Sequence, residues 1–353
     1  METARHARPA GTPPRSVLVL ATLTLISGTA TALWLLPGRA LTSAGTPAAP
    51  ISAQPAVGVG SPPPAAAAPA PRAPAYVAFV DAVRDPAFNL PDAARRTGVT
   101  TYTLGHISSG VSAACTPTWG GQAMPTPNPL VGGLNRLRAE GGDAGVAFGG
   151  PEGRELSATC ADPDLLLAAY RNVIATYHPA GLDFEVHDSS DPATTARRAT
   201  AIARLQRESR ERGRPLAVTF TLPASTLGLT PQDRTMLYQT RQAGAEISTV
   251  NLLVPFQPGS ARNVRRLLVA ARRTHAQLGW ALGTGERASW RRMGMTPLLA
   301  DPRDLTLLDA QRLVTFQTRY NLAWLSVRGA TPTDEVSRAF STTPTTPNFA
   351  QVN

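Results

Sequence analysis

The amino-acid sequence predicts an α/β fold, a (β/α)8 TIM barrel, for residues 75–340. Strand-like and helix-like segments alternate about eight times over roughly 260 residues, which is the order of elements in such a barrel. No glycine-rich nucleotide-binding fingerprint accompanies the strand-like segments. The chain has 353 residues, 42% of them hydrophobic, so it can bury a core of this size. An open, doubly wound parallel sheet is the alternative.

The segments that flank the predicted barrel are expected to stay outside its core. Residues 1–16 contain arginines and are expected in the cytoplasm, because the uncharged apolar run 17–36 is long enough to cross a bilayer as a single-pass anchor. The barrel would then lie outside the cell membrane. A cleaved signal peptide, and hence a secreted protein, is the alternative. Residues 37–74 predict a disordered linker rich in proline and alanine, and residues 341–353 a disordered tail.

The elements of the barrel follow from local patterns. Short apolar segments predict strands at residues 76–81, 100–106, 145–150, 180–188, 216–222, 247–254, 280–283 and 322–327. Two helices are predicted to begin at Asp-Pro pairs, because aspartate caps a helix and proline fits its first turn. The predicted helices are residues 85–98, 135–141, 162–177, 191–213, 231–244, 264–271 and 307–320.

The strand at residues 180–188 carries three ionisable side chains. Asp183, Glu185 and His187 occupy every second position, so all three are predicted to face one side of the strand. In a barrel that side is the lumen, with His187 at the mouth and Glu185 one layer deeper. Successive inward residues are about 6.6 Å apart, so Asp183 and His187 lie roughly 13 Å apart and cannot share a metal ion. We therefore expect neither a metal nor another cofactor here.

This strand resembles the D-G-x-D-x-D-x-E strand of glycoside hydrolase family 18, the chitinase-like TIM barrels, in their bacterial branch. Further segments resemble landmarks of that family in the same order: residues 115–121, 146–153, 221–223, 250–252, 295–297 and 309–310. The resemblance implies chitinase-type, substrate-assisted hydrolysis. A glutamic acid protonates the glycosidic oxygen, while the substrate's own acetamide carbonyl attacks the anomeric carbon.

The chain departs from the family where the resemblance assigns chemistry. His187 stands in place of the glutamic acid, and Glu185 in place of the aspartate that orients the acetamide, while Asp183 is retained. The resemblance assigns sugar-contacting positions on the remaining strands and loops. Gln257 or Phe256 replaces a tyrosine, Arg328 or Val327 replaces a tryptophan near Trp324, and Trp119 is a further candidate for stacking on sugar.

These departures predict an extracytoplasmic, catalytically inactive chitinase-like barrel that binds an envelope or N-acetylglucosamine-containing glycan. In the simplest interpretation His187 is only hydrogen-bonded to Glu185 or Asp188. One alternative is an active family 18 hydrolase that uses His187 or Glu185 as its acid. Another is a basic scaffold that docks an anionic polymer or protein, because the net charge is +10. No nucleic-acid partner is expected, since no binding motif accompanies the charge.

The chain contains two cysteines, Cys115 and Cys160. A disulfide between them is the only intramolecular pairing, and an oxidising compartment favours it. Two free buried thiols are the alternative. A zinc site is not expected, because no cysteine or histidine partners stand at ligand spacing.

Overall fold

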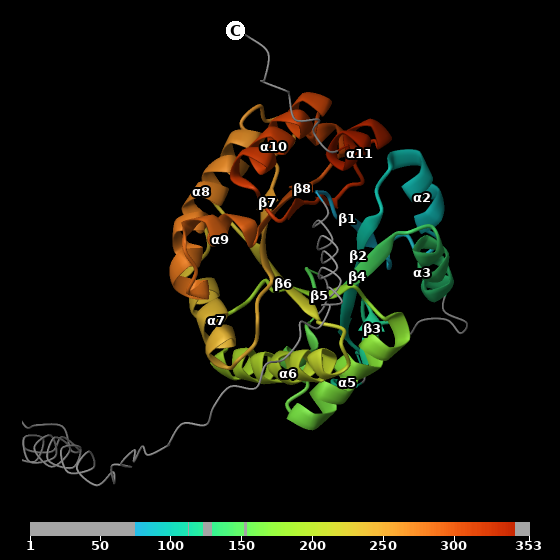
Figure 1. The fold of residues 1–353 in the computed structure, drawn as a ribbon, viewed down its shortest axis with the longest axis vertical. Helices are drawn as coiled ribbons and strands as arrows, with labels where there is room; N and C mark the ends of the chain where they lie inside the picture. Colours follow the sequence, from blue (N-terminus) through green and yellow to red (C-terminus); the bar gives the residue numbers. More distant parts are fainter. Residues whose placement is uncertain (1–74, 112, 123–128, 152–153, 343–353) are drawn as a thin grey trace, which may run out of the picture. The chain divides into compact units, whose positions relative to one another are not determined.

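A curled sheet surrounded by helices forms the folded domain (Figure 1). The computed structural model describes residues 75–111, 113–122, 129–151 and 154–342. In this part, parallel strands follow one another in the order β1-β2-β4-β5-β6-β7-β8-β10. Their bounds are β1 Ala78–Asp81, β2 Thr101–Ser109, β4 Asp143–Gly149, β5 Gly181–Glu185, β6 Ala217–Pro223, β7 Thr249–Pro255, β8 Met293–Leu299 and β10 Arg328–Gly329. The predicted α/β barrel is thus confirmed.

Two short strands and a bridge complete the sheet. β3 (Pro117–Trp119) pairs antiparallel with β2, and β9 (Trp324–Leu325) pairs parallel with β8. Tyr76 forms a parallel bridge with Leu325, and Val77 N donates to the Leu325 carbonyl at 2.9 Å. The first and last parts of the sheet are therefore joined, and the sheet closes on itself.

Helices cover the outside of the sheet (Figure 1). They are α2 Leu90–Thr97, α3 Pro129–Ala139, α4 Leu156–Thr159, α5 Pro163–Tyr177, α6 Pro192–Glu211, α7 Pro231–Gln242, α8 Asn263–Leu282, α9 Glu286–Arg291, α10 Leu307–Tyr320 and α11 Asp334–Ser341. The two predicted starts at Asp-Pro pairs are confirmed. Asp162 accepts from the backbone N–H groups of α5, and Asp191 from those of α6.

The predicted strand at residues 280–283 is wrong. Trp280 and Leu282 belong to the last turn of α8, and the strand that follows is β8, which begins at Met293. Leu278, Ala281 and Leu282 are buried and continue the helical spacing that begins at the N-terminal end of α8. A short apolar run at the end of an amphipathic helix does not by itself distinguish a helix from a strand.

Aromatic packing sets which face of β5 turns inward. Phe148, Phe184 and Phe220 lie on neighbouring strands, with ring centroids 5.4 and 5.6 Å apart along the row. Tyr170 of α5 packs edge-on against Phe148 and Phe184. This aromatic layer faces the helices, so the alternate residues of β5 must face the lumen.

The predicted membrane segment at residues 17–36, the linker 37–74 and most of the predicted tail lie outside the described residues. Among the helices that the structure does describe, none combines the length and the apolar character needed to cross a bilayer.

Candidate functional site

Two carboxylates of β5 lie inside the barrel. Asp183 is 6% exposed and Glu185 is 3% exposed, and both project from the side of the strand opposite Phe184. Their inward orientation is the one predicted from the alternation along the strand. Buried carboxylates need charged or hydrogen-bonding partners, because desolvation otherwise disfavours their ionised form.

Glu185 is held by three cationic or hydrogen-bonding side chains. Its Oε2 lies 2.9 Å from Nε2 of His106 and 3.5 Å from Nε of Arg328, and its Oε1 lies 2.9 Å from Nε2 of His187. Burial alone would raise the pKa of Glu185, but Arg328 and the hydrogen bonds from both histidines outweigh burial and lower that pKa. Glu185 is therefore an ionised carboxylate, and both histidines donate to it.

Asp183 is held by a chain of polar groups that crosses four strands. The Thr221 hydroxyl lies 2.8 and 2.9 Å from its two oxygens, and Arg328 Nη2 donates to it at 2.6 Å. Asn251 donates to Thr221 and accepts from Thr296. Burial raises the pKa of Asp183 above its ordinary value, and the Arg328 guanidinium opposes that rise without cancelling it.

Arg328 links the two carboxylates. It is 4% exposed, forms ion pairs with Asp183 and Glu185, and its guanidinium carbon lies 3.6 Å from the centroid of the Phe79 ring. The resemblance assigned a sugar-contacting position to Arg328 or Val327. In the structure Arg328 lines the pocket, but its guanidinium forms ion pairs with Asp183 and Glu185 of β5.

A pocket of about 390 Å³ opens above these groups at the carboxyl ends of the strands. Its lining combines apolar side chains from several strands, among them Phe79 and Phe256, with His106, Glu185 and Arg328 at polar positions. This size and this mixture are typical of small-molecule sites. In the described ranges, no three His, Cys, Asp or Glu side chains cluster so that they could hold a metal ion.

The structure brings some of the predicted site residues together. Phe256 lines the pocket, whereas Gln257 is exposed and its backbone is tied to the side chain of Asn263. His187 follows β5, its side chain is 38% exposed, and its ring contacts Glu185. That contact is the one expected in the simplest interpretation of His187.

Two predicted sugar-stacking tryptophans do not reach the pocket. Trp119 is 3% exposed and donates from Nε1 to the Tyr177 hydroxyl at 2.8 Å, so it packs from β3 against α5. Trp324 lies against Gly294 near the start of β8, at the opposite end of the strand from the pocket. A buried tryptophan that finds a partner for its N–H is a core residue.

His106 is a site residue that the sequence interpretation missed. It lies on β2, lines the pocket and contacts Glu185. The signal was present, because residue 106 ends a predicted strand and such positions form the mouth of a barrel.

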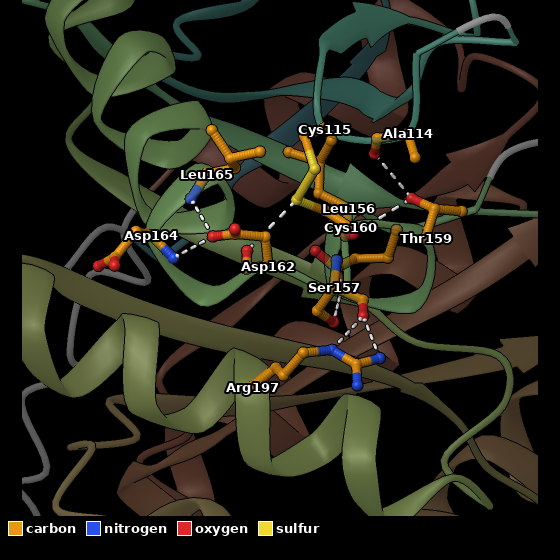
Figure 2. Close-up of a disulfide and its surroundings, with 11 residues drawn as sticks. Ala114, Cys115, Leu156, Ser157, Thr159, Cys160, Asp162, Asp164, Leu165 and Arg197 are labelled. Carbon is orange, nitrogen blue, oxygen red and sulfur yellow. Dashed lines mark hydrogen bonds between the residues drawn. A yellow bond between two sulfur atoms is a disulfide. The ribbon is translucent and has the colours of Figure 1, made fainter.

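The predicted disulfide between Cys115 and Cys160 is present (Figure 2). It joins the segment before β3 to the end of α4, beside the start of α5. Nearby, the Thr159 hydroxyl donates to the Ala114 carbonyl at 2.9 Å, and Arg197 of α6 donates to the Ser157 carbonyl. The loops on this side of the barrel are thus tied to one another and to α6.

Comparison with known proteins finds chitinases. A probable bifunctional chitinase/lysozyme from Escherichia coli is 28% identical over 180 residues, which are 50% of this chain and 20% of the relative. Endochitinase 11 from Metarhizium anisopliae is 26% identical over 181 residues, which are 50% of this chain and 34% of the relative. The chain therefore spans well under two thirds of either relative. No protein-family model matches the chain.

The fold matches that of a solved chitinase domain. The catalytic domain of a hyperthermophilic chitinase from Pyrococcus furiosus superposes with a TM-score of 0.64 and 23% identity, covering 76% of this chain and 94% of that domain. The curled parallel sheet, the inward carboxylates of β5 and the similarity to two chitinases all point to a chitinase-like fold. The chain is therefore similar to chitinases in sequence over about half of its length, and its fold is that of a chitinase catalytic domain.

Proposed function

We propose that the pocket at the barrel mouth binds an N-acetylglucosamine-containing or other envelope glycan, and that the barrel does not hydrolyse it. One observation carries the proposal. Glu185 is held as a carboxylate by Arg328, His106 and His187, while His187 occupies the position that the resemblance assigns to the proton donor. A general acid must carry its proton at working pH and reach the leaving oxygen.

Each candidate acid of this strand is engaged elsewhere. The lowered pKa of Glu185 leaves it without a proton to donate. Asp183 has a raised pKa, but its oxygens are occupied by Thr221 and Arg328 below the mouth. His187 directs Nε2 at Glu185, so only Nδ1 remains for a ligand. Misplacing one catalytic group costs on the order of a hundredfold in rate, and here several positions differ together.

Binding is supported by what the pocket retains. Phe256 contributes an apolar surface, and His106 and Arg328 lie beside it. Aromatic rings stack on the apolar faces of sugars, while polar groups fix their orientation. The relatives named as chitinases support a chitin-like ligand, although the chain spans only part of their lengths.

The test compares turnover with affinity on the full-length protein. Release of p-nitrophenol from p-nitrophenyl chitobioside should stay at the blank rate, while calorimetry should detect binding of chitotetraose. Phe256→Leu removes an aromatic surface from the pocket and should weaken binding at least about tenfold. Trp280→Leu removes an exposed ring from α8 and serves as the matched control. Chromogen release at the rate of an active chitinase would show that the barrel is an active hydrolase. Equal losses of chitotetraose affinity in the two variants would show that the pocket is not the binding site.

We further propose that the barrel works outside the cytoplasm, anchored through residues 17–36 or secreted. The disulfide between Cys115 and Cys160 supports this, because such bonds persist in oxidising compartments. Protease added to intact cells should degrade an anchored barrel, while a cytoplasmic marker survives. Protection of the barrel until the cells are lysed would place it inside.

A further inference from the structure

The outward side of α8 carries a row of unneutralised arginines. From residue 257 to residue 300 the chain has eight arginines and a single acidic residue, Glu286. Within α8 and at its N-cap, most of these arginines are exposed and Arg266 is half-buried; they are Arg262, Arg265, Arg266, Arg272 and Arg273. In the described part of the chain, none of these five forms an ion pair with an acidic side chain.

Some arginines on other helices of the same barrel have an acidic partner. Arg95 of α2 pairs with Glu140, Arg171 of α5 with Glu208, and Arg312 of α10 with Asp309. Arg207 and Arg210 of α6 also form no ion pair among the described residues, but Glu208 and Glu211 stand next to them in that helix. The row on α8 differs because its helix contains no acidic residue. Figure 1 shows α8 in the outer ring of helices that surrounds the sheet.

The placement of these charges opposes helix stability. The N-terminal end of α8 carries Arg262, Arg265 and Arg266, its first turn has no acidic residue, and its last turn has no basic residue. The helix dipole favours the reverse arrangement, with acids at the start and bases at the end. Like charges three and four residues apart, such as Arg262 with Arg265 and Arg266, also repel one another. An external anion would relieve both effects.

We propose that this row, Arg262 to Arg273 on α8, binds a linear polymer that carries phosphate at regular intervals. Residues 262 and 273 are about 16 Å apart along the helix, and the adjacent pairs at 265/266 and 272/273 are about 10 Å apart. A single phosphate meets one such pair, whereas a chain of phosphates meets them all. Guanidinium forks bind phosphate oxygens in pairs, so the chemistry of the row fits this ligand.

A membrane surface fits the row less well. On the same side of α8, Val269 lies between the arginines and Ala276 lies beyond them, and both offer little apolar surface for insertion. Trp280, beyond the row, is the one large exposed apolar side chain of α8, and its ring is stacked on Tyr238 with centroids 5.0 Å apart. The row also lies on the outer side of the barrel, apart from the glycan pocket, so its function does not depend on that pocket.

The test uses the full-length protein and long-chain inorganic polyphosphate, titrated by calorimetry at two salt concentrations. The triple variant Arg265→Gln, Arg266→Gln, Arg273→Gln should weaken binding at least about tenfold and lower the salt dependence of log Kd by roughly two to three units. The control Arg207→Gln, Arg210→Gln, Arg214→Gln removes the same charge from exposed positions on and just after α6 and should stay within about twofold of wild type.

Stability provides a second readout. Because the row opposes the helix dipole, the α8 variant should unfold at the same temperature as wild type or higher, which a structural role for these arginines does not predict. Equal weakening by the α6 control would show that net charge alone binds the polymer and would overturn the proposal. So would binding to phosphatidylglycerol vesicles without binding to soluble polyphosphate, since that result assigns the row to a membrane.

Discussion

At the scale of single residues, Arg328 sets the charge state of the barrel lumen. It contacts both buried carboxylates of β5, while its Nη1 has no hydrogen-bond partner among the described groups. Paired buried ions are tolerated because the attraction between them offsets their desolvation. Removing one partner leaves the other charge buried and uncompensated, so the lumen depends on this residue more than on any surface ion pair.

Arg328→Met should therefore destabilise the domain by about 3–5 kcal/mol, the usual effect of breaking a buried ion pair. Urea unfolding followed by tryptophan fluorescence measures the change. Arg207→Met, at an exposed position on α6, is the matched control and should change the free energy of unfolding by less than about 0.5 kcal/mol. Similar values for the two variants would mean that the carboxylates do not need Arg328.

The pKa of Glu185 makes the barrel sensitive to acid. In the folded state this pKa is lowered, so below the ordinary glutamate value of about 4.3 the unfolded chain binds more protons than the folded one. The stabilisation from Glu185 is complete above that value and is lost as the pH falls. Asp183 acts in the opposite sense, because its raised pKa makes the folded state the stronger proton binder above about pH 3.9.

Melting temperatures measured between about pH 2 and pH 7 separate the two carboxylates. Glu185→Gln should flatten the fall in melting temperature towards low pH, and Asp183→Asn should steepen it. The comparison rests on the slopes, because both variants also lose contacts with Arg328. An unchanged acid slope in Glu185→Gln would show that Glu185 titrates normally in the folded barrel.

At the scale of the elements, the alternation of side chains along β5 correctly predicted which of them face the lumen. Asp183 and Glu185 face the lumen because Phe184 between them packs against the helix layer. Trp119 and Trp324 were misplaced because whether an aromatic ring reaches a pocket depends on tertiary neighbours such as Tyr177 and Gly294. Those neighbours are remote in sequence, so no local pattern shows them.

The disulfide joins elements that local sequence cannot connect. Cys115 and Cys160 are 45 residues apart, and closing a loop of that length stabilises a domain by about 4 kcal/mol in the chain-entropy account. The Cys115→Ala, Cys160→Ala variant should lose about 2–4 kcal/mol of unfolding free energy in urea. The reductant TCEP should destabilise the wild type and leave that variant unchanged. A loss below about 1 kcal/mol would mean that Thr159 and Arg197 hold these loops without the bond.

At the scale of the whole molecule, the resemblance predicts the fold but does not by itself predict the chemistry of the site. Resemblance to the family 18 barrels predicted the architecture, because that depends on many strands and helices that each tolerate substitution. The site depends on a few positions. The resemblance places His187, Glu185, Gln257 or Phe256, and Arg328 or Val327 where the family has other residues. Of these, His187 and Arg328 contact Glu185. His187, Glu185 and Arg328 therefore form a connected network, whereas Gln257 lies apart from it.

That network predicts the outcome of restoring the acid. His187→Glu places a second carboxyl beside Glu185, where like charges repel, while Arg328 still holds Asp183 and Glu185 and Gln257 still lies outside the pocket. Turnover of p-nitrophenyl chitobioside should therefore stay near the blank for the single variant. Adding Glu185→Asp, Gln257→Tyr and Arg328→Trp restores the family's residue types under one of the placements that the resemblance leaves open. Any activity should emerge only in the combination, because groups that act as a unit are strongly non-additive. Calorimetric binding of chitotetraose serves as the control for folding and pocket integrity. Full activity from His187→Glu alone would show that the rest of the network never blocked catalysis.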